Sequence, residues 1–78
     1  MSQVEFDDPH VMAAWVAVQM NRPGEMKTIL VVETSLNLNQ EDKAYDSDSI
    51  KGLVAKVWRY LAAHQHIESA ELVPIKIA

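Results

Sequence analysis

The chain has 78 residues, 49% of them hydrophobic and 23% charged, with a formal net charge of −4 and no cysteine. This length and composition indicate a single globular domain, residues 1–78, with one small core. The lack of cysteine excludes disulfide bonds, thiol catalysis and thiolate metal sites. It also favours a cytoplasmic protein, because small secreted domains usually depend on disulfides. No stretch approaches the roughly 20 apolar residues of a transmembrane helix, so we expect no membrane partner.

Residues 9–20 fit two structures. Asp8 as a cap and Pro9 in the first turn favour a helix over residues 9–20. The alternation over residues 15–20 and the turn signal Pro23-Gly24 favour a strand over residues 12–20, the first half of a β-hairpin. The hairpin is the interpretation we prefer, and the helix remains the alternative.

The pairing across this hairpin decides which side chains share a face. Folding the chain back about Pro23-Gly24 sets polar against polar and apolar against apolar residues, as cross-strand pairs prefer. The resulting pairs are Arg22–Glu25, Gln19–Thr28, Val18–Ile29, Val16–Val31 and Trp15–Val32. In this register Val16, Val18, Ile29 and Val31 lie on the face opposite Trp15, Leu30 and Val32. An L-proline type II turn twists the wrong way for a two-residue hairpin, so we expect a longer loop, which leaves the register open.

Residues 26–38 are predicted as the second strand of the hairpin. Residues 29–32 are apolar on both faces, and the residues after them alternate between apolar and polar. The span exceeds a usual strand, so a bend or an end is expected near Leu36. Residues 39–46 are polar and acidic, and we interpret them as a loop.

Residues 47–65 are predicted as one long amphipathic helix. Its apolar positions recur at the spacing of one buried face: Ile50, Leu53, Val54, Val57, Trp58 and Leu61. Asp46 or Ser47 caps this helix. We expect Trp58 and Leu61 to be core residues. Gly52 either admits the backbone of another element or is simply tolerated near the helix start.

Residues 69–77 are predicted as a C-terminal strand, in which Pro74 marks an edge or a bulge because it lacks a backbone donor. The elements together predict an α+β fold, a small two-layer domain of hairpin, helix and strand. The alternative is an αβαβ order with residues 9–20 helical. A single helix covers one face of the sheet. Because the predicted sheet is apolar on both faces, we expect a second copy of the chain to cover the other face, giving a homodimer.

Few groups could carry chemistry. His64 and His66, with Glu68 beyond, have the residue types of a zinc site, but positions i and i+2 of a helix point apart. The acidic loop lacks the glycine and the glutamate of an EF-hand. We find no nucleophile motif and no phosphate-binding glycine loop. We therefore expect no enzymatic activity, no cofactor and no metal.

The charges are unevenly distributed. Residues 1–50 hold nine acids against three bases, and residues 51–78 hold two acids against four bases. We expect a non-catalytic protein-binding domain of the interaction, regulatory or inhibitor type, as in small phage or bacterial accessory proteins. Its candidate interaction residues are Glu41, Asp42, Asp46, Lys56, Arg59 and Tyr60. The alternative is a weak nucleic-acid-binding module that uses the basic helix face of Lys51, Lys56 and Arg59.

Overall fold

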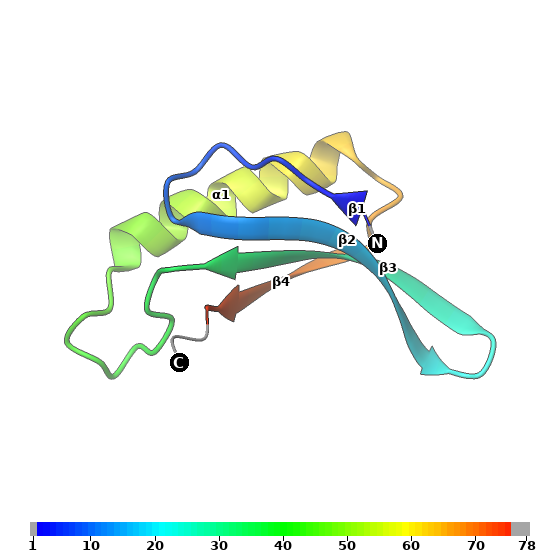
Figure 1. Ribbon diagram of the computed structural model, residues 1–78, viewed down its shortest axis with the longest axis horizontal. Coiled ribbons are helices and arrows are strands. Elements are labelled where there is room, and N and C mark those ends of the chain that lie inside the picture. Colours follow the sequence, from blue (N-terminus) through cyan, green and yellow to red (C-terminus); the bar gives the residue numbers. More distant parts are fainter. Residues whose placement is uncertain (1, 76–78) are drawn as a thin grey trace.

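The computed structural model describes residues 2–75 and shows a β-sheet with one helix packed on one of its faces (Figure 1). The elements in chain order are β1 (Ser2–Gln3), β2 (Val11–Arg22), β3 (Glu25–Thr34), α1 (Ser47–Ala63) and β4 (Ser69–Pro74). The strand order in the sheet is β1-β2-β3-β4, antiparallel except for the parallel pair β3 and β4. The predicted two-layer α+β domain is therefore confirmed in its hairpin form, and a helix over residues 9–20 is wrong.

The ends of the strands have local causes. β3 ends at Thr34, short of the predicted residue 38, because the Thr34 hydroxyl donates to the His10 carbonyl at 2.8 Å and accepts from the Leu36 N–H at 3.1 Å. These bonds turn the chain, and Leu36 enters the core. β4 ends at Pro74, and the predicted residues 76–77 of this strand lie outside the described residues. Two-residue β1 was not predicted, since so short a strand has no periodicity to detect.

β4 is an edge strand, as Pro74 predicted. Thr34 pairs with Pro74, and its carbonyl accepts from the Ile75 N–H at 3.0 Å. Backbone groups alternate in direction along a strand, so the nitrogens of Ala70, Leu72 and Pro74 point to the free edge. Pro74 offers no donor there, which is a usual place for proline in a sheet.

The turn of the hairpin is tight, and a bulge follows it. Arg22 pairs with Glu25, as predicted, and Gly24 has a φ of 82°, the left-handed conformation that a type II turn requires. The predicted longer loop is therefore wrong. An irregularity between Met20 and Arg22 leaves Asn21 as an extra residue in β2, so that Met20 pairs with Met26.

This bulge changes which side chains share a face. Beyond it Val16 pairs with Leu30 and Trp15 with Val31, one residue away from the predicted register. Because side chains alternate with a period of two, one inserted residue moves every later side chain to the other face. The predicted assignment of side chains to the two faces of the sheet is therefore wrong. Val16 and Val18 lie with Leu30 and Val32 on the helix side, whereas Trp15 lies with Ile29 and Val31 on the opposite side.

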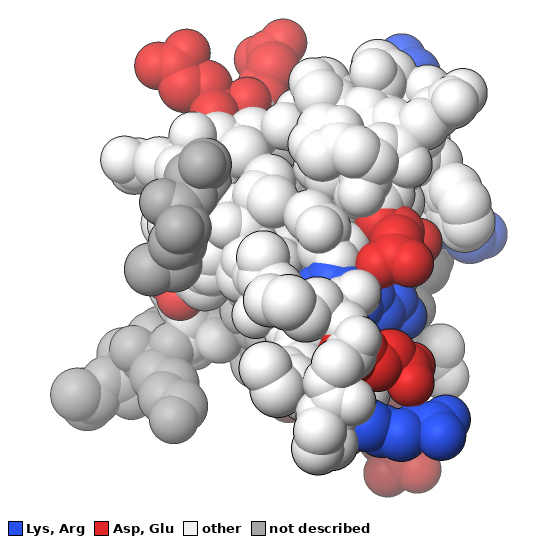
Figure 2. Space-filling view, turned by 90° about the vertical axis from the view of Figure 1, so that its right-hand side faces the viewer, with Lys and Arg blue, Asp and Glu red and all other residues white. Residues whose placement is uncertain are grey.

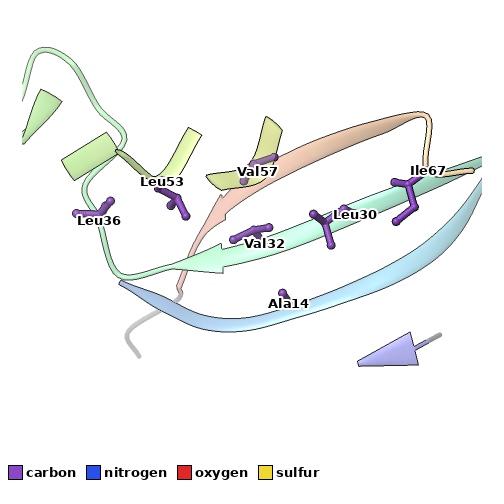
Figure 3. Packing of buried hydrophobic residues seen from close by; sticks show 7 residues of the cluster. All are labelled: Ala14, Leu30, Val32, Leu36, Leu53, Val57 and Ile67. Atoms are coloured by element: carbon purple, nitrogen blue, oxygen red, sulfur yellow. The ribbon is translucent and has the colours of Figure 1, made fainter. Parts of the chain in front are cut away.

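The core lies between the sheet and α1. Leu30, Val32 and Leu53 are fully buried, and Figure 3 shows Leu53 and Val57 of α1 lying over Leu30 and Val32 of β3. The buried apolar cluster consists of Ala14, Leu30, Val32, Leu36, Leu53, Val57 and Ile67. Trp58 is 67% exposed, so its predicted place in the core is wrong. Five residues after Leu53, it lies about 140° around the helix from that buried side chain.

Candidate interaction surfaces

The acidic loop, residues 39–46, holds three of the predicted interaction residues, Glu41, Asp42 and Asp46, all of them exposed. The Asp46 carboxylate caps α1 by accepting from Ser49 Oγ at 2.6 Å and from the Ser49 N–H at 3.2 Å. These two bonds, the hydroxyl bond first, lower the pKa of Asp46. The Ala44 N–H, donating at 3.0 Å, lowers the pKa of Asp42. The loop therefore presents carboxylates that stay ionised at neutral pH.

Lys56, predicted as an interaction residue, is engaged within the fold. Its Nζ donates to the Asp7 carbonyl at 2.8 Å and lies 3.1 Å from Asp8 Oδ2, which ties α1 to the connection between β1 and β2. The Asp8 side chain is 6% exposed and that of Lys56 37%. Burial alone would raise the pKa of Asp8, but the His10 N–H at 2.8 Å and the Lys56 ammonium outweigh burial and lower it.

Tyr60 belongs to an aromatic stack at the end of α1. Its ring lies parallel to that of His64, with centroids 4.0 Å apart, and its centroid is 5.9 Å from that of Phe6. His66 meets His64 edge-on at 6.2 Å. Within residues 2–75, no three or more histidine, cysteine, aspartate or glutamate side chains gather as a metal site. Tyr60 thus packs the N-terminal segment against the helix through Phe6, and His64 stacks on Tyr60.

The basic residues of α1 do not form one compact face. Lys51 and Lys56 lie about 140° apart around the helix axis, with Arg59 between them. Lys51 and Arg59 are exposed, whereas Lys56 makes the contacts to Asp7 and Asp8. Two exposed cations on a chain of net charge −4 give a small positive surface.

The open face, defined as the side of the sheet opposite α1, has no second layer among the described residues (Figure 1). Its centre consists of Trp15, Ala17, Ile29 and Val31, which the strand register places side by side. Ile29 and Val31 are 8% and 9% exposed, because neighbouring side chains on the same face surround them, while Trp15 is half-buried. The same face carries Glu33, Glu71 and Val73 toward the carboxyl end of β3. The open face is thus apolar at its centre and acidic at one end.

The α1–β4 groove is a second apolar surface. It has a volume of about 310 Å³ and is lined by Val54, Val57, Trp58, Leu61, Glu68, Ser69, Ala70 and Leu72. The exposed Trp58 ring lies along the helix side, and the free edge of β4 lies on the other.

The third surface is the arm, residues 18–28, where the hairpin continues past the start of β4. Ile29 is the first β3 residue paired with β4, so the arm is a ribbon of two strands. It bends away from α1 (Figure 1) and contributes to an elongated molecule of 43 × 27 × 20 Å. Val18, Met20 and Met26 are 59%, 63% and 64% exposed and lie on the side of the sheet that carries α1. These three side chains are called the arm strip below.

Comparisons with family models, with curated proteins and with solved structures found no match to this chain. The described part of the chain contains no helix long and apolar enough to cross a membrane.

Sequence reasoning missed the arm strip and the groove. The apolar residues at positions 18, 20 and 26, on either side of a turn, were a usable signal for the strip. Trp58 at the border of the apolar arc of the helix was a signal for the groove. The open face was expected, but with Val16 and Val18 in it in place of Trp15 and Ala17.

Proposed function

We propose that this protein is a non-catalytic protein-binding domain that contacts its partner through the open face and the acidic loop. One observation supports this most directly: a partly buried tryptophan, Trp15, lies at the centre of a sheet face that no described element covers. Tryptophan in such a setting is the residue type that most often dominates the free energy of protein association.

The charges around this face indicate the chemistry of the partner. Glu71 of β4 lies beside Val31 and Glu33 lies next to the carboxyl end of β3, and the chain continues from that end into the acidic loop (Figure 1). A complementary partner has an apolar centre bordered by lysine or arginine. Exposed carboxylates of this kind act mainly on the rate of encounter, so association is expected to slow as salt is added. We place this binding in the cytoplasm, as an accessory or inhibitor-type role, because the chain lacks cysteine.

The test begins with affinity capture of a partner from the source cell and purification of that partner. Association is then measured by surface plasmon resonance for the wild type and for Glu33→Lys/Glu71→Lys, which reverses two charges of the open face. The association rate constant is expected to fall about tenfold or more at low salt. Glu41→Gln/Asp42→Asn is expected to slow association to a smaller extent. Asp46 is left unchanged because it caps α1.

The matched control is Lys51→Glu/Arg59→Glu, which reverses two exposed charges on the opposite layer and should leave partner binding unchanged. Unaltered association of the open-face variant would contradict the proposal. A salt-sensitive shift of labelled DNA or RNA that the helix variant abolishes would replace it with the nucleic-acid module.

A further inference from the structure

The outer edge of β4, on the side away from β3, carries backbone groups that pair with no strand within residues 2–75. The Ile75 N–H faces inward and donates to the Thr34 carbonyl at 3.0 Å. Backbone groups alternate in direction along a strand, so the N–H and C=O groups of Ala70 and Leu72 face outward, as does the Pro74 carbonyl. Ala70 and Leu72 therefore each offer a donor and an acceptor at this edge, and Pro74 offers an acceptor.

The α1–β4 groove lies over this edge on the helix side. Ala70 and Leu72 line the groove from β4, on the face of that strand that packs toward the core. Val54, Trp58 and Leu61 line it from α1 and lie within about 60° of one another around the helix. Trp58 is 67% exposed, so the sheet leaves this part of the apolar arc uncovered. A further strand beside β4 would lie beneath the arc and cover it.

We propose that an extended segment of the partner protein adds to β4 as a fifth, antiparallel strand of the sheet. This inference rests on the proposed function and names the segment by which that partner binds. Its first, third and fifth residues are opposite Pro74, Leu72 and Ala70, so that both outward donors and the Pro74 carbonyl find backbone partners. In strand addition the main-chain hydrogen bonds supply affinity, and the alternate side chains supply specificity.

This register determines the chemistry of the segment. The side chains of its third and fifth residues lie on the same face as Leu72 and Ala70 and enter the groove, so they are apolar. The groove has a volume of about 310 Å³, at the small end of ligand pockets, which suits a few side chains of a strand. The second residue is opposite Val73 and is apolar. The fourth is opposite the exposed Glu71 and is a lysine or arginine, because opposite charges at cross-strand positions stabilise pairing.

A second copy of β4 fits this edge less well than such a segment. Two copies that pair around Glu71 or around Leu72 use both outward N–H groups within the described strand. In the first register the two Glu71 side chains are directly opposite each other, and in the second they are diagonal neighbours on one face. Like charges at these positions oppose pairing, whereas a basic residue is favourable there. The occupant is therefore a segment of another protein.

The test is amide hydrogen exchange by NMR with the capped probe peptide Ser-Gln-Thr-Val-Leu-Lys-Val-Ser-Gln. Its flanks are uncharged because the added strand runs on toward the arm end, where Figure 2 shows uncharged surface over the middle of the view. At millimolar peptide, exchange of the Ala70 and Leu72 N–H groups should slow about tenfold or more, because both become hydrogen-bonded. The N–H groups of Glu71 and Val73 already face β3 and should change little. The peptide of reversed sequence is the control and should give weaker protection.

The variant Glu71→Lys tests the charge pair. It should weaken binding of the probe about threefold or more and favour the same peptide with glutamate in place of lysine. The matched control is Glu5→Lys, at an exposed acid beyond the opposite edge strand, and it should leave both affinities unchanged. Ala70→Pro removes one outward donor and no inward one, so it should stay folded by circular dichroism and bind the probe about fivefold more weakly.

Unchanged exchange at Ala70 and Leu72 in the presence of the probe would overturn the proposal. Protection of these two amides without peptide, together with twice the chain mass of 8.8 kDa in light scattering, would also overturn it and assign the edge to a second copy. Slower association of the open-face variant with the captured partner, without protection by the probe, would refute strand addition and leave the proposed function standing.

Discussion

Replacing Asp8 by alanine should destabilise the protein well beyond the effect of an ordinary surface substitution. The Asp8 side chain is 6% exposed and accepts from the His10 N–H at 2.8 Å and from Lys56 Nζ at 3.1 Å. Hydrogen bonds to charged groups contribute about 1.5–3 kcal/mol each. More than a third of the Lys56 side chain is exposed, so solvent screens that bond and its contribution falls to about 1 kcal/mol.

Burial of the Asp8 carboxylate offsets part of these two contributions, so we expect Asp8→Ala to lower the free energy of unfolding by about 2 kcal/mol. In a domain of this size, that lowers Tm by roughly 8–16 °C. Lys56→Ala should cost about 1 kcal/mol. The double variant should be less destabilised than the sum of the two, with a coupling energy of about 1 kcal/mol. Urea denaturation of the four proteins measures this cycle. Additivity to within about 0.3 kcal/mol would show that the two side chains do not stabilise each other and would refute the reasoning.

The pH dependence of the same pair has a definite sign. The pKa of Asp8 is lowered in the folded protein, so its stabilisation is present above the ordinary pKa of 3.8. It is lost as the pH falls through the lowered folded value. The difference in Tm between the wild type and Asp8→Ala should therefore be constant from pH 5 to pH 7 and shrink below pH 3.8. A difference that grows on acidification would assign the stabilisation to another group.

Other substitutions test the packing of α1. Gly52→Ala should raise the free energy of unfolding by about 1 kcal/mol in thermal melts, because an added Cβ meets no atom within 4 Å; a loss of stability would mean that another backbone needs this space. Leu53→Ala should cost about 3 kcal/mol because Leu53 is fully buried. Trp58→Ala should lower the free energy of unfolding by only about 1 kcal/mol, since Trp58 is mostly exposed. A larger loss for Trp58→Ala than for Leu53→Ala in calorimetry would show that Trp58 is a core residue. Asp46→Ala should lower Tm at pH 7, because it removes the cap of α1. The difference in Tm from the wild type should shrink below pH 3.8, because the pKa of Asp46 is lowered in the folded protein.

The sequence predicted those parts of the fold that local patterns determine. The turn residues Pro23-Gly24 and the alternation around them located the hairpin, and the acid at position 46 located the start of α1. The register could not be predicted, because no local pattern distinguishes Asn21 as a bulge residue from the polar residues beside it. One unpaired residue was enough to exchange the two faces of β2.

The surfaces were predicted less well, because they depend on contacts between distant residues. The bond between Lys56 and Asp8 joins residues 48 positions apart, and nothing near Lys56 indicates it. The apolar positions of α1 span a wider arc of the helix than the part that packs on the sheet. The stacking of Tyr60 with His64 and Phe6 favours the other side of that arc, and Trp58 is left at its exposed border. The acidic loop was placed correctly on the surface because carboxylates are rarely buried unless a cation pairs with them.

The bulge at Asn21 makes the two strands of the hairpin unequal in how they tolerate the loss of a residue. Counted from the turn, β2 is two residues longer than its pairing with β3 requires, and the extra residues are Met12 at the far end and Asn21 beside the turn. Deleting Asn21 leaves Arg22 opposite Glu25 and Met20 opposite Met26, so the rest of the sheet keeps its present pairs. A deletion between residues 13 and 20 instead shifts every residue before it in β2 by one, which exchanges buried and exposed side chains. Across natural variants of this chain, loss of one residue from β2 is therefore compatible with the core at position 21 or position 12, and between these two positions it is not.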